Sequence, residues 1–130
     1  RDYPGFFAAG LPCCAPWYDA TDKDIELLAQ APLWFTHSKG DELVDPHRTV
    51  LPLVGRLREA GADVHCTYFD HVEDLTGRYR EADGSPKKTF NHGVWINQFN
   101  DLCYQDIDGG SVLIDGEPVG CWEWAARVSR

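Results

Sequence analysis

The chain has 130 residues, of which 43% are hydrophobic and 25% are charged, and its formal net charge at pH 7 is −9. This length suits a single domain, and the mixture of apolar and charged residues is typical of a globular protein and excludes a disordered one. The negative charge argues against a nucleic-acid partner, because phosphate binding requires clustered Lys and Arg side chains. The longest apolar stretches are far shorter than the ~20 residues that a membrane-spanning helix needs, so no membrane partner is expected.

The N-terminus and the cysteines bear on the origin of the chain. Residues 1–4 contain neither an initiator Met nor an apolar signal region, which indicates an internal part of a longer protein. The five cysteines include no C-x-x-C pair, so they are predicted to be reduced and mostly buried. We therefore expect a cytoplasmic location, with secretion as the alternative.

Three short apolar segments are predicted to be buried strands. Residues 7–14 form an apolar run bounded by Gly and Pro. Residues 33–37 combine Leu, Trp, Phe and Thr, and residues 63–69 are rich in β-branched and aromatic side chains. Such runs are typical of parallel strands, which are covered on both faces.

Two helices are predicted between these strands. Thr21 resembles an N-cap, and the short helical segment that follows it ends before Pro32. Apolar residues in 47–60 recur at helical spacing, with Pro52 placed in the first turn and Gly61 as the C-terminal stop. The alternation of strands and helices predicts an α/β fold, in which helices flank a parallel sheet.

The rest of the chain is predicted to be less regular. Residues 70–91 contain many turn formers and no hydrophobic period, so they should form a long loop. Residues 92–104 have the spacing of a helix. The C-terminal segment predicts a β-hairpin, in which 112–114 and 119–122 flank a turn. The apolar face expected for the helix consists of Trp95, Ile96, Phe99 and Cys103.

Two polar residues follow the ends of consecutive predicted strands. Asp41 comes shortly after 33–37, and His92 closes the long loop after 63–69. In open parallel sheets, ligands bind at the edge where the carboxyl ends of the strands lie. An acid after one strand and a histidine after the next is also the order that α/β-hydrolases show behind their nucleophile.

The surrounding sequence resembles the α/β-hydrolase family. Residues 32–44 are similar to the family's acid loop, a strand followed by H-G-x-x-D-x-x-V-P, and residues 57–62 are similar to the end of the helix after it. Within the family, the likeness is to prolyl-oligopeptidase-like and polyhydroxybutyrate-depolymerase-like serine esterases, in which a segment like 3–9 follows the nucleophile helix. The likeness covers residues 3–104.

The resemblance implies that residues 1–130 are the C-terminal half of one hydrolase domain, with a C-terminal hairpin. The parent protein would hydrolyse a carboxylic ester, or else a peptide bond, through an acyl-serine intermediate. Asp41 would act as the triad acid, His92 as the base and Trp95 as a substrate-binding residue, with no metal or cofactor. Since the chain contains no G-x-S-x-G, it lacks the nucleophile and is expected to be inactive alone. Its expected partners are a small-molecule ester or peptide, and the missing N-terminal half or a second copy of the chain.

Several alternatives stay open at this point. Asp45 is a second candidate for the acid, and a non-catalytic binding or oligomerisation module with a hydrolase-like fold is a second candidate function. A cysteine hydrolase that uses Cys13 or Cys66 with His92 is less favoured, because both cysteines lie inside predicted strands. His37 is expected to be a packing and hydrogen-bonding residue. Irregular spacing disfavours a zinc site among the remaining ligand-type residues. These are Cys13, Cys14, His65, Cys66 and His71.

Overall fold

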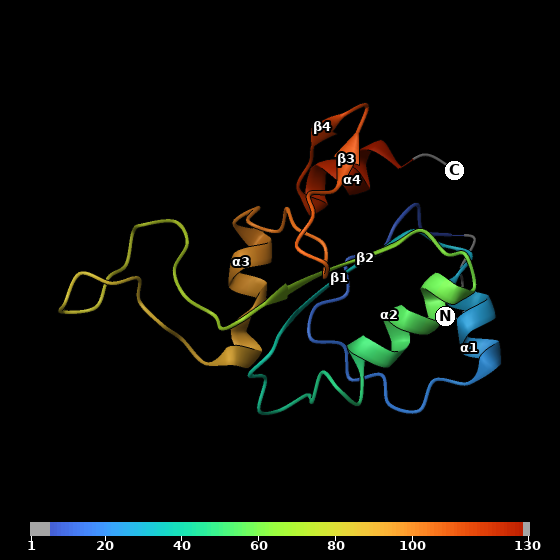
Figure 1. The fold of residues 1–130 in the computed structure, drawn as a ribbon, viewed down its shortest axis with the longest axis horizontal. Helices are drawn as coiled ribbons and strands as arrows, with labels where there is room; N and C mark the ends of the chain where they lie inside the picture. The colour runs from blue at the N-terminus through green and yellow to red at the C-terminus, as the bar shows by residue number, and fades with distance from the viewer. Residues whose placement is uncertain (1–5, 129–130) are drawn as a thin grey trace.

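Three parallel chain segments form the centre of the structure, a computed structural model that describes residues 6–128 (Figure 1). β1 (Leu33–Ser38) pairs in parallel with β2 (Val64–Phe69) along its whole length, which confirms the second and third predicted strands. The other edge of β1 receives residues 10–14 through two isolated parallel bridges, so the first predicted strand is only partly formed. Residues 1–4, on which the expectation of a longer protein rests, lie outside the described part.

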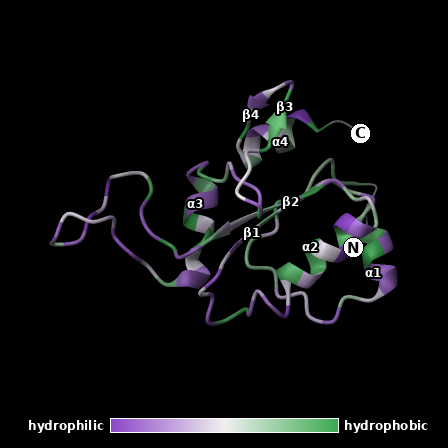
Figure 2. Cartoon of the chain, viewed as in Figure 1, coloured by the Kyte–Doolittle hydropathy of each residue, from purple (hydrophilic) through white to green (hydrophobic). Residues whose placement is uncertain are grey.

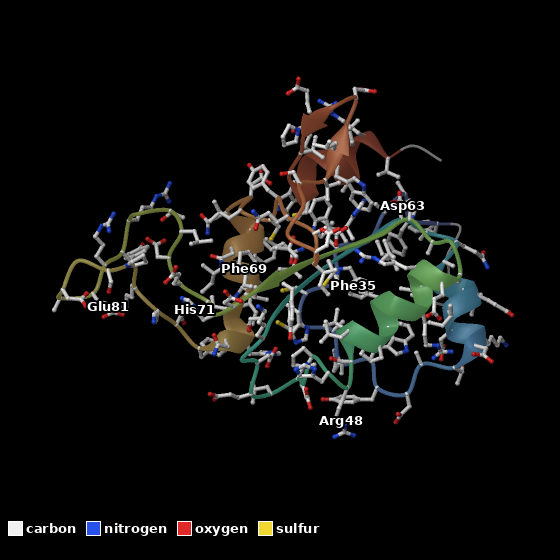
Figure 3. All side chains as sticks on the ribbon, viewed as in Figure 1. Phe35, Arg48, Asp63, Phe69, His71 and Glu81 are labelled. Atoms are coloured by element: carbon white, nitrogen blue, oxygen red, sulfur yellow. The ribbon has the colours of Figure 1, made fainter. Side chains whose placement is uncertain are left out.

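Two helices cover one face of this sheet. α1 (Asp22–Leu28) and α2 (Val50–Glu59) lie side by side against it. Phe35 points from β1 toward α2, where it packs with the fully buried Leu57 (Figure 3). Pro52 lies in the first turn of α2, where its missing N–H has no helical partner to lose. The amphipathic helix predicted for this region is therefore confirmed.

The predicted helix ends are also confirmed. The Thr21 side chain accepts a hydrogen bond from the backbone N–H of Asp24, and the Asp24 carboxylate accepts one from the backbone of Thr21, which is a capping box. Gly61 follows the last turn of α2, where its φ of 76° suits glycine, and the N–H of Ala62 donates to the carbonyl of Leu57 at 3.0 Å. Across residues 6–128, each helix is too short or too polar to cross a membrane.

The C-terminal part of the chain covers the opposite face (Figure 1). Trp34 is completely buried there and packs edge to face against Trp124, with ring centroids 5.6 Å apart. The arrangement differs from the predicted hairpin, because only β3 (Leu113–Ile114) and β4 (Glu117–Pro118) pair, and α4 (Cys121–Arg127) replaces the second strand. The reason is that a helix buries its first residue and Trp124 on one face, since side chains three apart point the same way.

The helix predicted for 92–104 is shorter and buries a different face. A short 3-10 turn, η1 (Asn91–Gly93), leads into α3 (Trp95–Phe99). The Gln98 side chain donates a hydrogen bond to the carbonyl of Leu11, on the segment beside β1, and this contact turns polar residues inward. The expected apolar face is therefore confirmed only in part, because Cys103 is buried but two other members are exposed. The buried residues of α3 are Asn97 and Gln98, and the exposed ones include Ile96 and Phe99.

The long loop predicted at 70–91 is present and extends away from the sheet (Figure 1). Glu81 lies near the far end of the loop (Figure 3), and most residues of the loop are hydrophilic (Figure 2). Isolated antiparallel bridges, Glu73 with Lys88 and Arg80 with Pro86, hold the two arms of the loop together. The loop returns the chain to the sheet directly before His92.

A partly buried carboxylate joins the C-terminal part of the chain to the sheet. Asp106 accepts hydrogen bonds from Nδ1 of His65 at 2.8 Å and from Nη2 of Arg58 at 2.7 Å. The backbone N–H groups of Cys66 and Ile107 donate to the same side chain. Burial raises the pKa of Asp106, but these hydrogen bonds and the Arg58 charge outweigh it and lower the pKa from 3.8 to about 2.

We expect Asp106→Asn to lower the free energy of unfolding at neutral pH by about 2 kcal/mol, which is the difference between the folded and unfolded pKa values converted to energy. Because the folded pKa lies below the unfolded one, this stability is complete above about pH 4 and is lost as the pH falls toward about 2. Urea unfolding as a function of pH measures the effect. The exposed neighbour Asp108 supplies the control, since Asp108→Asn should change stability by less than about 0.5 kcal/mol. A deficit in the Asp106 variant that stays constant down to about pH 2 would contradict this prediction.

Candidate active site

Asp41 lies in the loop that leaves the C-terminal end of β1. All six residues of β1 are buried, so the chain emerges from the core just before this loop. The Asp41 side chain is completely buried. Oδ1 accepts hydrogen bonds from the backbone N–H groups of Leu43 and Val44, each at 2.9 Å. The loop therefore fixes the carboxylate through its own backbone.

His92 contacts this carboxylate from the other side. Its Nδ1 lies 2.9 Å from Oδ2 and 3.1 Å from Oδ1 of Asp41. An ionised carboxylate can only accept, so Nδ1 carries the proton and the neutral ring keeps its lone pair on Nε2. The side chain of His92 is 24% exposed, in contrast to the buried acid. The structure thus brings together the two residues that the sequence places after consecutive strands.

The charge state of Asp41 follows from its surroundings. Burial raises the pKa of Asp41, but hydrogen bonds from the backbone of Val44, from the His92 side chain and from the backbone of Leu43 lower it, and the charge of His92 adds to them. The balance is a pKa below the ordinary value for aspartate. The residue is therefore an anion at neutral pH, as a partner for an imidazolium must be.

A second histidine also contacts Asp41. His37 is completely buried in β1, and its Nε2 lies 2.9 Å from the carbonyl oxygen of Val44 and 3.2 Å from Oδ2 of Asp41. Because both partners accept, Nε2 carries the proton. Burial lowers the pKa of His37, which keeps the ring neutral. The packing and hydrogen-bonding role expected for His37 is confirmed, and its contact with the acid is new.

Close contacts lock the loop of His92 against the loop of Asp41. The Ser38 hydroxyl donates to the carbonyl oxygen of Asn91 at 2.7 Å. Gly40 lies so close that a Cβ there would be 2.5 Å from Nδ2 of Asn91. The Cys14 thiol donates to the carbonyl oxygen of His92 at 3.2 Å. The imidazole therefore sits on a backbone held by neighbours from two separate parts of the chain.

We expect Gly40→Ala to lower the free energy of unfolding by about 1–3 kcal/mol, because the new methyl group overlaps the Asn91 side chain and must push the histidine loop away. Chemical denaturation measures this loss. Gly55→Ala is the matched control, since Gly55 is in α2 and a methyl group added there would meet open space; it should be stabilising by up to about 1 kcal/mol. Equal effects of the two changes would show that the Gly40 contact is not tight.

Aromatic side chains flank His92. The Trp95 ring lies edge to face with the imidazole, with centroids 5.7 Å apart. Phe90 packs against Trp95 at 5.6 Å and is itself more than half exposed. The predicted substrate-binding residue Trp95 is thus next to the histidine, where it offers an apolar surface.

The other candidates from the sequence lie elsewhere. Asp45 is exposed, and its carboxylate accepts a hydrogen bond from the backbone of His47. It is Asp41, therefore, that contacts His92. Burial raises the pKa of the Cys66 thiol to about 12, which opposes the thiolate that a cysteine nucleophile requires.

Metal-ligand side chains come together at one place within residues 6–128. Ligand atoms of Cys14, His37 and Asp41 lie within 4.8 Å of one another. The zinc ligands considered from the sequence form a different set. Two of them, His65 and His71, are hydrogen-bonded to the carboxylates of Asp106 and Glu73. Asp41 and Cys14 already make hydrogen bonds with His92, so the three residues are explained as part of the histidine–aspartate site without a metal ion.

Comparison with known proteins places the fold. No family model and no curated protein sequence matches the chain. A solved structure described as the crystal structure of a thermostable esterase is similar over 99% of this chain, with a TM-score of 0.62 and 22% sequence identity. The matched region is 26% of that esterase chain, so the present chain spans about a quarter of its length. The chain therefore shares an α/β fold with part of that esterase.

Proposed function

We propose that this chain supplies the acid and the base of a serine hydrolase triad within a longer protein. The observation that carries the proposal is the hydrogen bond from Nδ1 of His92 to the buried carboxylate of Asp41. It lies at the C-terminal edge of a parallel sheet, where α/β folds place their ligands. The fold shared with an esterase favours a carboxylic ester as substrate, with a peptide bond as the second choice.

The proposed chemistry uses each group in the state that the structure favours. Nε2 of His92 removes the proton from a serine hydroxyl as its oxygen attacks the ester carbonyl carbon, and the same proton then goes to the departing alkoxide. Asp41 remains an anion, holds the tautomer and stabilises the imidazolium. Water, deprotonated by His92, then hydrolyses the acyl-serine. The serine and the oxyanion donors come from residues outside this chain, and Trp95 with Phe90 forms an apolar wall for the substrate.

The proposed partner of this chain is the remaining part of the same domain. In residues 6–128, the segment 10–14 pairs with β1 on one edge, and no described strand covers its other edge. Phe6 and Phe7 beside it are 79% and 61% exposed. An uncovered edge with apolar neighbours favours pairing with another strand, supplied by the N-terminal part or by a second copy.

Covalent labelling with a fluorophosphonate tests the proposed mechanism. In the full-length protein, the probe should label one serine outside the 130 residues, and His92→Ala should slow that labelling by at least about 10²-fold. The isolated chain should remain unlabelled. Labelling of Cys13, or labelling whose rate is independent of His92, would contradict the proposal.

A further inference from the structure

Two cysteines meet in the core on the C-terminal side of the sheet. Cys103 follows α3, and Cys121 is the first residue of α4. Both side chains are completely buried and belong to the same hydrophobic cluster as Trp34 and Trp124. The backbone N–H of Cys121 donates to the carbonyl oxygen of Cys103 at 2.9 Å. The segment after α3 and the start of α4 are therefore joined at these two residues.

The spacing fits a covalent link. A backbone hydrogen bond of this kind places two Cα atoms roughly 5–6 Å apart. Disulfides span Cα separations of about 4.4–6.8 Å. Each of the two thiols is also the largest influence on the pKa of the other.

The two thiols are chemically unequal. The hydrogen bond from Cys121 lowers the pKa of Cys103, and the hydroxyls of Thr36 and Thr67 assist against the opposing effect of burial. The same contact and burial raise the pKa of Cys121. The Thr36 hydroxyl lies 3.8 Å from Sγ of Cys103, which supports Cys103 as the attacking thiolate in thiol–disulfide exchange and leaves Cys121 as the resolving thiol.

We propose that Cys103 and Cys121 form an intramolecular disulfide that joins α4 and the β3–β4 hairpin to the segment after α3. The oxidant is a low-molecular-weight disulfide. The Cys103 thiolate attacks one of its sulfurs, which breaks that S–S bond, forms a mixed disulfide and releases one small thiol. The Cys121 sulfur then attacks Cys103, which forms the protein disulfide and releases the second small thiol. The two protein thiols are oxidised, the small disulfide is reduced, and the two protons end on the released thiols.

The other cysteines are poorly placed for this reaction. Cys66 is also completely buried, but it packs in the cluster on the opposite face of the sheet. Cys13 and Cys14 are consecutive residues, and the Cys14 thiol is engaged with the carbonyl of His92. Because both sulfurs of the proposed pair are buried, exchange proceeds when the C-terminal segment opens, and closure then seals the bond inside the core.

The test is disulfide mapping on the full chain. The reduced protein is incubated with oxidised glutathione, free thiols are alkylated under denaturing conditions, and non-reduced peptides are identified by mass spectrometry. We expect one linked pair that contains Cys103 and Cys121, with Cys66 alkylated. The oxidised chain should melt about 5–10 °C higher than the reduced chain, because the link restricts the unfolded state.

Variants separate the pair from the remaining thiols. The rise in melting temperature should be absent in Cys103→Ser and Cys121→Ser and retained in the control Cys66→Ser. The peptide map of the unmodified chain needs no variant, so it decides the matter even if a serine variant fails to fold. Alkylation of all five cysteines, or a link from Cys103 or Cys121 to another cysteine, overturns the proposal.

Discussion

His92→Ala in the full-length protein is expected to lower kcat/KM for p-nitrophenyl acetate by at least about 10³-fold, because no other group would take the proton from the serine nucleophile. The imidazole is partly exposed, and without it Asp41 keeps its contacts with Leu43, Val44 and His37, so the variant should still fold. Steady-state hydrolysis measures the loss, and an unchanged melting temperature shows that it does not arise from unfolding.

His71→Ala is the matched control for this prediction. His71 lies on the long loop (Figure 3), and its ring contacts Glu73 on the exposed surface. Its removal should change kcat/KM by less than about threefold, since it has no part in the proposed proton transfer. Activity that survives the His92 change, or that falls equally in the His71 variant, would contradict the assignment of the base.

Asp41→Asn is expected to lower kcat by about 10²- to 10⁴-fold with a small change in KM. The amide has nearly the shape of the carboxylate, but it lacks the charge that stabilises the imidazolium, and it no longer fixes the proton on Nδ1 of His92. Separate values of kcat and KM for ester hydrolysis by the full-length protein provide the measurement. A rise in KM alone would indicate a binding role instead.

Asp45→Asn distinguishes the two candidate acids. Asp45 is exposed, and its side chain caps the turn at His47, so its change should reduce kcat by no more than a few fold. A large loss in the Asp45 variant, with near-normal activity in the Asp41 variant, would reverse the assignment and remove the structural basis of the proposed triad.

The sheet and α2 were predictable because local signals agreed with the tertiary structure. The residues of β1 are buried without interruption, as expected for a strand covered on both faces. In α2, the apolar spacing, the early Pro52 and the terminal Gly61 all favour the same helix limits. Sequence patterns suffice where each local preference supports the packing of the whole.

The C-terminal part was harder to predict because its packing depends on distant contacts. The inward orientation of Gln98 results from a hydrogen bond to Leu11, which is far away in the sequence. Similarly, residues 119–122, which were expected to form the second strand of a hairpin, lead into a helix that buries Cys121 and Trp124. Periodicity alone cannot distinguish such short segments.

The candidate site was predictable in position and not in detail. Strand order places Asp41 and His92 at the same edge of a parallel sheet, which is why both could be singled out from sequence. Two contacts of the site join separate segments of the chain: Gly40 lies close to Asn91, and the Cys14 thiol donates to the carbonyl oxygen of His92. No pattern within either segment reveals them.

The measurement that tests the central proposal most directly is a double-mutant cycle on kcat/KM of the full-length protein. Asp41→Asn, His92→Ala and the double variant are compared with the unmodified enzyme in ester hydrolysis. If the acid acts through the base, the double variant should be no slower than His92→Ala alone, within about threefold. Losses that multiply in the double variant, or a double variant that retains full activity, would contradict a triad built on Asp41 and His92.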